Sequence, residues 1–278
     1  MDLKEARLNQ ADRHPWEGAR LEVVTSLWKK HLPQCRGGAC TNVLDIGCGD
    51  AWLVEQLAER FPRASFRSVD PALSDCELEA VHDRLRLKPV NVFRDLDAAL
   101  DGNEDLVDLV LMLDVLEHIA DDDQFLTHLA SQPQIGRQTS FLITVPAWQE
   151  LFCSHDEFLG HYRRYTVPSL CEVLQRTGFA VEQSGYYFSG LMVARYTHLL
   201  AERFKLNRPG ACGVSRQSAL PLWDALLRSG LILDFKLGQM LRSWGVELPG
   251  LSCFAVARPR TANLPTVTEV FSRAMAEK

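Results

Sequence analysis

The chain of 278 residues is expected to fold as an α/β protein, with a mostly parallel sheet of seven strands covered by helices on both faces. Short apolar runs of strand length alternate with stretches of helical periodicity, and the pattern does not repeat. The run from Leu109 to Leu113 is apolar without a break, as a central strand buried on both faces requires. A glycine turn at Gly47 and Gly49 joins the first apolar run directly to a helix-forming stretch.

The first half of the chain predicts strands and helices in alternation. The segment 14–20 runs into 21–31, where the apolar residues fall on one face, and together they indicate a helix with Pro15 near its first turn. A loop with paired glycines then leads to the first strand. The expected strands are 42–46, a run ending at Ser68-Val69-Asp70, 87–92 and 107–113, and the expected helices are 51–60, 75–84, 96–100 and 117–130.

The second half predicts three more strands and an insert. Pro146 ends a strand at 141–146, and Gly178 stops a helix at 167–177. Strands at 179–187 and 251–258 are separated by two amphipathic helical stretches, 191–204 and 220–244. We therefore divide the chain into an N-terminal helical cap (1–40), a main domain (41–190 and 251–260), a helical insert before the last strand (191–250) and a C-terminal tail (261–278).

Composition limits the classes of function. The net charge of −6 provides no basic field for a phosphate backbone, so a nucleic-acid substrate is disfavoured. Residues 1–10 lack the apolar core of a signal peptide, and no apolar run approaches the length of about 18 residues that a membrane span needs. The eight cysteines form no Cys-x-x-Cys pair and have no nearby histidine at zinc-ligand spacing. We expect a cytoplasmic protein with reduced, mostly buried thiols and no metal.

The glycine turn has the features of a nucleotide cradle. Glycine lets the backbone approach a ligand closely, and the first turn of the following helix presents unpaired N–H groups. From Gly49 to Asp70 is 70 − 49 = 21 positions, which fits one crossover helix and the next strand. An acid at this distance binds ribose hydroxyls in dinucleotide-binding folds. Ala51 and Trp52 stand where pyrophosphate recognition needs small residues, which argues against NAD.

Three strings together resemble the class I S-adenosylmethionine-dependent methyltransferases, which have a Rossmann-like fold. They are Val-Leu-Asp-Ile-Gly-Cys-Gly at 43–49, Ser-Val-Asp at 68–70 and Leu-Asp-Val-Leu-Glu-His at 113–118. The resemblance covers roughly residues 12–190 and the last strand. It implies S-adenosylmethionine as the cofactor and the following cofactor-binding residues: Trp16, Asp45, Gly47, Cys48, Gly49, Asp70, Asp95, Asp114 and His118.

The same resemblance assigns roles within this set. The glycine turn faces the methionine and ribose parts, Asp70 holds the ribose hydroxyls, Asp95 contacts the adenine amine, and the segment around Trp16 closes over the cofactor. Helix capping is the alternative for Asp95 and Asp114. A purely structural role is the alternative for Trp16, for its neighbours His14 and Arg20, and for His118. Glu117 is expected to border the cofactor and shape the pocket.

The most distinctive string is Ser-His-Asp-Glu-Phe-Leu-Gly-His-Tyr-Arg-Arg-Tyr-Thr at 154–166. So many charged groups directly after a strand predict a polar network at a pocket, with an exposed loop as the alternative. A similar His-Asp-x-x-x-Gly-His-x-Arg-Arg-Tyr string marks one bacterial branch of the family, where it forms part of a substrate-side lid. We call residues 154–166 the lid segment.

The lid segment supplies the candidate catalytic and substrate-binding residues. If the acceptor is a hydroxyl, a base near neutral pH is needed, and His155 and His161 are the candidates. Asp114 or Asp156 either acts as the base itself or orients a histidine. Arg163 and Arg164, with Tyr165, either bind an acidic substrate group or pair with acids of the lid segment itself. In-line methyl transfer needs no metal.

We therefore predict a methyltransferase acting on a small-molecule or lipid-like acceptor at a hydroxyl group. One alternative is a catalytically inactive S-adenosylmethionine-binding scaffold or regulatory protein that uses the insert as a partner surface. A second alternative is a nicotinamide-dependent dehydrogenase, which Ala51 and Trp52 weaken. The insert either packs on the body, forms a homodimer interface, or meets a greasy substrate or a membrane face.

Overall fold

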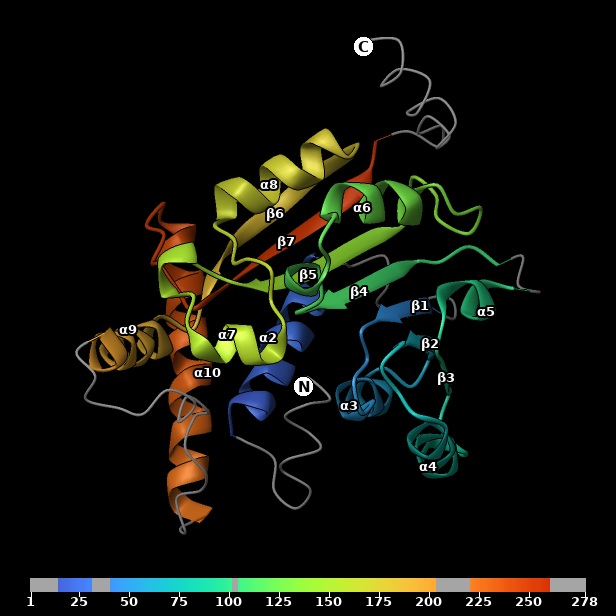
Figure 1. The fold of residues 1–278 in the computed structure, drawn as a ribbon, viewed down its shortest axis with the longest axis horizontal. Coiled ribbons are helices and arrows are strands. Elements are labelled where there is room, and N and C mark those ends of the chain that lie inside the picture. The colour runs from blue at the N-terminus through green and yellow to red at the C-terminus, as the bar shows by residue number, and fades with distance from the viewer. Residues whose placement is uncertain (1–14, 32–40, 102–104, 204–220, 261–278) are drawn as a thin grey trace.

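The computed structural model describes residues 15–31, 41–101, 105–203 and 221–260 (Figure 1). Its centre is a seven-stranded sheet in the order β3-β2-β1-β4-β5-β7-β6. Strand β7 is antiparallel to both neighbours, and all other neighbouring strands pair parallel. The strands are β1 (Thr41–Ile46), β2 (Ala64–Val69), β3 (Val90–Phe93), β4 (Leu109–Leu113), β5 (Ser140–Pro146), β6 (Phe179–Tyr187) and β7 (Ser252–Pro259). The predicted fold class is confirmed.

Helices cover both faces of the sheet (Figure 1). On one face α2, α3 and α10 contribute to a core cluster with Leu111 of β4, and on the other α5, α6 and α8 contribute to a second cluster with Val110. The apolar run of β4 thus serves both faces, as its composition predicts. The helices are α2 (Pro15–His31), α3 (Trp52–Arg60), α4 (Asp75–Leu85), α5 (Leu96–Leu100), α6 (Asp122–Ala130), α7 (Ser154–Leu159), α8 (Val167–Arg176), α9 (Ser189–Arg203) and α10 (Pro221–Ser243).

The expected helix at 117–130 is wrong as one element. A short 3₁₀ turn, η2 (Leu116–His118), is followed by a break, and α6 begins only at Asp122. The reason is local, because the side chain of Asp121 accepts a hydrogen bond from the N–H of Gln124 and so caps a new helix. A second 3₁₀ turn, η3 (Gln149–Leu151), separates β5 from α7.

The helices of the insert pack on the body with one face only. Leu231 and Phe235 of α10 are buried in the core cluster that includes α2. Other large apolar side chains of α10 and the residues after it lie exposed, among them Leu233, Met240 and Trp244. Packing on the body therefore accounts for one face of α10, and the homodimer, substrate and membrane interpretations stay predictions for the other.

Some expectations fall on residues that the structure does not describe. These are the segment before Pro15 with His14, the loop that precedes β1, and the C-terminal tail at 261–278. Within the described ranges, no helix combines the length and the apolarity that crossing a bilayer requires.

Candidate active site

The glycine turn after β1 has the backbone that its residues predict. Gly47 and Gly49 have φ values of +75° and +58°, in the left-handed region that favours glycine. The N–H of Gly47 donates to the carbonyl of Val69 over 2.7 Å, which fixes the turn against the end of β2. A Cβ on Gly47 would lie 2.6 Å from Cγ2 of Val115. The turn therefore fits between β2 and the segment after β4 only without a side chain at 47.

Asp70 and the glycine turn lie in direct contact. Oδ2 of Asp70 accepts from the N–H of Gly49 over 2.7 Å, and Oδ1 accepts from the N–H of Ala72 over 3.0 Å. Burial raises the pKa of the nearby Asp45 carboxyl to about 7, opposed by the Ser68 hydroxyl and reinforced by the charge of Asp70. Burial also raises the pKa of the Cys48 thiol. The structure thus brings together the predicted residues Asp45, Gly47, Cys48, Gly49 and Asp70.

Asp114 follows β4 at the same edge of the sheet. Its Oδ1 accepts from the hydroxyl of Thr144 over 3.1 Å, and its Oδ2 lies 3.0 Å from the Arg20 guanidinium. Arg20 comes from α2, is buried, and lies over the ring of Trp16, 5.6 Å from its centroid. The predicted Trp16 and Asp114 are therefore joined through Arg20.

These residues lie where ligands bind in open α/β sheets. β1 pairs with β2 on one side and with β4 on the other, so the strand order reverses between β1 and β4. The glycine turn, Asp70 and Asp114 all follow the carboxyl ends of these strands. We call this carboxyl edge between β1 and β4 the cofactor crevice, because ligands of open α/β sheets bind at such a switch in strand order.

Asp95 caps the helix that follows it. Its carboxylate accepts from the N–H of Ala98 over 2.6 Å at the start of α5, and the side chain is exposed. The structure thus shows the capping role that the sequence left as an alternative, and the adenine contact stays a prediction.

Asp156 is the centre of a buried polar network in the lid segment. Oδ1 accepts from Nδ1 of His161 over 2.9 Å and from Nε of Arg164 over 2.8 Å. Oδ2 accepts from the N–H of Cys153 and from Arg195, each over 3.0 Å. Burial alone would raise the pKa of Asp156, but the His161 hydrogen bond and the Arg164 and Arg195 charges hold it well below its usual range. The predicted polar network is confirmed.

The predicted substrate-binding residues have partners within the protein. Arg163 pairs with Asp122 over 3.0 Å, and the hydroxyl of Tyr165 donates to the same carboxylate over 2.7 Å. Arg164 pairs with Asp156 and donates to the carbonyl of Ala147. Their contacts fix the lid segment on η2, α6 and β5, and a role in substrate binding stays a prediction.

The two candidate histidines have different surroundings. The N–H of His155 donates to Sγ of Cys153, and its ring lies 6.5 Å from the ring of Phe158, which is half exposed. His161 is held by Asp156, and its ring meets that of His118 edge-on, with centroids 4.6 Å apart. His161 is therefore the histidine that the structure joins to the segment after β4.

Glu117 lies beside this histidine pair and is fully buried. Neither of its carboxylate oxygens has a hydrogen-bond partner among the described residues. Burial, reinforced by the charge of Asp114, raises the pKa of Glu117 well above its ordinary value, against the charges of Arg20 and Arg164.

Sequence reasoning gave too little weight to Arg20 and missed Asp122 and Arg195. For Arg20 the sequence offered two alternatives, covering the cofactor or a purely structural role. No local pattern marks Arg195, which lies on a helix of the insert, 195 − 156 = 39 positions from its partner Asp156. Asp122 follows Asp121 in an acidic run that reads as a helix start. Only their contacts in the folded chain show that these residues belong to the site.

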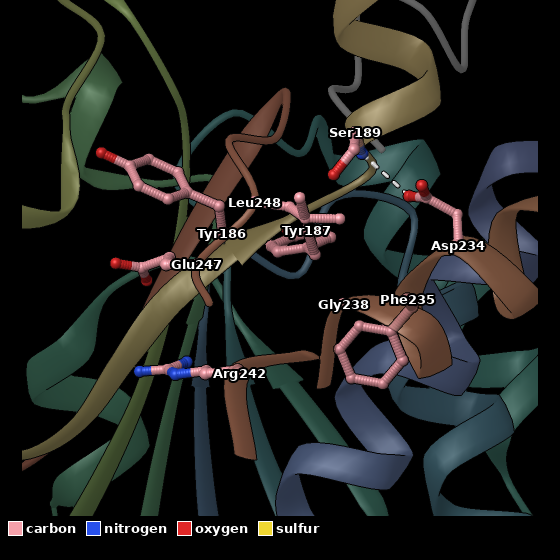
Figure 2. A pocket seen from close by; sticks show the side chains of 9 residues that line it. All are labelled: Tyr186, Tyr187, Ser189, Asp234, Phe235, Gly238, Arg242, Glu247 and Leu248. Carbon is pink, nitrogen blue, oxygen red and sulfur yellow. Dashed lines mark hydrogen bonds between the residues drawn. The ribbon is translucent and has the colours of Figure 1, made fainter. Parts of the chain in front are cut away.

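A separate hollow lies between the end of β6 and α10 (Figure 2). Figure 2 shows the Asp234 carboxylate bonded to the N–H of Ser189 at one rim, over 2.8 Å. The lining of this hollow includes Tyr187, Phe235 and Arg242 and none of the predicted site residues.

Comparison with known proteins agrees with this geometry. A family model described as a methyltransferase domain matches residues 16–184, more than half of the chain. This chain belongs to that methyltransferase family. The predictions of a class I methyltransferase domain and of S-adenosylmethionine as its cofactor are confirmed at the level of the family, and the finer bacterial branch defined by the lid segment stays a prediction.

Relatives of this methyltransferase are distant. A ubiquinone biosynthesis O-methyltransferase of Rhizobium rhizogenes is 33% identical over 94 residues, 34% of this chain and 37% of the relative. A protein of Mycolicibacterium smegmatis named as a probable S-adenosylmethionine-dependent methyltransferase is 27% identical over 177 residues, 63% of each chain. The match thus spans less than two thirds of either relative.

Among solved structures, a methyltransferase chain from the Haloferax volcanii complex with the activator Trm112 superposes with a TM-score of 0.51 at 13% identity. The match covers 89% of this chain and 96% of that one. At this identity it shows the shared fold.

Proposed function

We propose that the chain transfers the methyl group of S-adenosylmethionine to a hydroxyl group of a small-molecule or lipid-like acceptor. The observation that carries this proposal is the bond between Nδ1 of His161 and Asp156. Because an ionised carboxylate can only accept, Nδ1 carries the proton and Nε2 is left as the proton acceptor. An imidazole oriented in this way by a buried carboxylate is an arrangement of general-base catalysis.

The chain's own residues account for each part of the reaction. The glycine turn, Asp70 and Asp114 hold the cofactor at the carboxyl edge of the sheet. The acceptor hydroxyl gives its proton to Nε2 of His161 while its oxygen bonds to the methyl carbon. The carbon–sulfur bond breaks in line with this attack, and neutral S-adenosylhomocysteine leaves. Asp156, Arg164 and Arg195 act as positioning residues for His161.

Two observations support the choice of acceptor. One relative is named for O-methylation in ubiquinone biosynthesis, a reaction on a lipid-like molecule. Apolar side chains are exposed on α9 (Tyr196), on α10 (Leu233) and directly after α10 (Trp244), and they offer a surface for a greasy acceptor. Of these elements, α9 is tied to the lid segment through Arg195. A scaffold without chemistry would have no use for an oriented base at the crevice.

The first test is calorimetric titration of the purified protein with S-adenosylhomocysteine and, separately, with NAD. We expect binding of the first alone, weakened roughly 10-fold to 100-fold in Asp70→Asn, since hydrogen bonds to charged groups contribute about 1.5–3 kcal/mol. Asn retains one acceptor for the turn, and circular dichroism checks that the variant is folded. Binding of NAD, or of neither ligand, would overturn the proposal.

The second test measures the transfer of a labelled methyl group from S-adenosylmethionine to prenylated phenols and to their amine analogues. We expect transfer to the phenols. His161→Gln should lower kcat by about 10²-fold or more, in the range of general-base catalysis, with the affinity for S-adenosylhomocysteine retained. His155→Gln should lower kcat far less. Transfer only to amines, or full kcat in His161→Gln, would refute the hydroxyl and base assignments.

A further inference from the structure

The cluster of Glu117, His118 and His161 has the composition of a metal site. The ligating atoms of the three side chains all lie within 4.8 Å of one another. The three side chains come from two segments, η2 after β4 and the lid segment. The two segments are joined by a hydrogen bond from the N–H of Tyr162 to the carbonyl of Glu117, over 2.7 Å. In a tetrahedral site with metal–ligand bonds of about 2.1 Å, the ligand atoms lie about 3.4 Å from one another. Small side-chain rotations would therefore close the cluster on a cation.

Glu117 provides the independent reason to expect a ligand. Its side chain is fully buried, and both carboxylate oxygens lack hydrogen-bond partners among the described residues. An unpaired buried carboxylate is costly, so such a group normally takes up a proton, pairs with a cation or coordinates a metal. The two arginines whose charges act on Glu117 each pair with another acid, Arg20 with Asp114 and Arg164 with Asp156. The carboxylate of Glu117 is thus left facing the two imidazoles.

His161 is oriented as a metal ligand would be. Histidines that bind metals commonly donate their other ring N–H to a carboxylate, which fixes the tautomer and the ring plane. Nδ1 of His161 makes this bond to Asp156 over 2.9 Å, which leaves Nε2 as the nitrogen available to a metal. Arg164 and Arg195 fix the carboxylate in turn. This second layer of contacts is already formed.

We propose that Glu117, His118 and His161 bind one divalent transition-metal cation whose open positions take the acceptor's hydroxyl oxygen. Two imidazoles and one carboxylate suit Zn²⁺, Mn²⁺, Fe²⁺ or Co²⁺ better than Mg²⁺ or Ca²⁺, which prefer oxygen ligands throughout. Binding of the cation does not depend on the proposed function, whereas its contact with the acceptor rests on that function. With Nε2 of His161 bound to the cation, the cation would lower the pKa of the hydroxyl. It would thereby replace the proton acceptance that we assign to His161 in the metal-free chain.

The experiment titrates EDTA-treated, dialysed full-length protein with Co²⁺ and Zn²⁺ by calorimetry, and follows the visible absorption of bound Co²⁺. We expect one cation per chain. Glu117→Gln and His118→Ala should each weaken binding at least 10-fold, while His128→Ala, at an exposed histidine of α6, should leave it unchanged. Glu117→Gln keeps the shape of the side chain, and circular dichroism confirms the fold of every variant.

Titration of the same samples with S-adenosylhomocysteine separates this inference from the proposed function. Wild type that binds S-adenosylhomocysteine but no stoichiometric cation would overturn the metal site and leave the methyltransferase proposal standing. Cation binding that survives Glu117→Gln and His118→Ala would also overturn it. Cation binding lost in both variants, with S-adenosylhomocysteine affinity retained, would establish the site. If phenol methylation also stops after EDTA treatment and returns with Zn²⁺ or Mn²⁺, the contact with the acceptor is supported.

Discussion

Replacing Asp156 by Asn should destabilise the protein strongly, although the two side chains have nearly the same shape. Four donors share the carboxylate, two on each oxygen: His161 and Arg164 on Oδ1, and Cys153 and Arg195 on Oδ2. An amide nitrogen cannot accept, so two donors lose their acceptor whichever way the Asn amide lies. The side chains of Arg164 and Arg195 are only 6% and 13% exposed, so water cannot replace the lost charge.

Removing one partner of a buried ion pair typically costs about 3–5 kcal/mol. For a chain of this size each kcal/mol lowers Tm by roughly 2–4 °C, so we expect a drop of about 10 °C. Urea unfolding followed by circular dichroism measures the free energy directly. Glu157→Gln is the matched control, because it removes the neighbouring but exposed carboxylate and should change stability by less than about 0.5 kcal/mol. Equal effects of the two substitutions would refute the reasoning.

Two further predictions concern the cofactor crevice. Gly47→Ala would add a Cβ 2.6 Å from Val115 at a φ of +75°. The substitution should cost about 1–3 kcal/mol of stability and weaken the binding of S-adenosylhomocysteine. Gly136→Ala, which has open space around its Cβ, is the control and should be nearly neutral in thermal melts. Asp45 has a folded pKa of about 7 against an ordinary value of 3.8, so the folded chain keeps a proton that the unfolded chain releases. Its contribution to stability therefore falls as pH rises from about 4 to 7, by at most about 4 kcal/mol. Asp45→Asn should therefore flatten the difference between urea melts at pH 5 and pH 8, and an unchanged difference would count against the burial argument.

The sheet was predictable from the sequence because its signals are local. Apolar runs, Pro146 and Gly178 mark strand and helix ends directly, and the observed elements agree with most predicted bounds. The split between η2 and α6 was missed because helical composition continues through the break at residues 119–121, and only the cap made by Asp121 reveals it.

The site was only partly predictable, because its chemistry depends on which charges meet in the folded chain. Motif spacing placed Gly49 and Asp70 at one edge, and the structure joins them. Spacing alone did not show that the arginines of the lid segment would be taken up by Asp122 and Asp156, or that His161 rather than His155 would be oriented by Asp156. These choices follow from burial and tertiary contacts, which a single sequence does not contain.

The cations that complete the site come from outside the main domain. The segment after β4 supplies the partly exposed Asp114, and the lid segment supplies the fully buried Asp156. Arg20 of α2 lies 3.0 Å from Asp114, and Arg195 of α9 lies 3.0 Å from Asp156. The predicted cap and insert therefore each neutralise a carboxylate that the main domain alone would leave with less compensation.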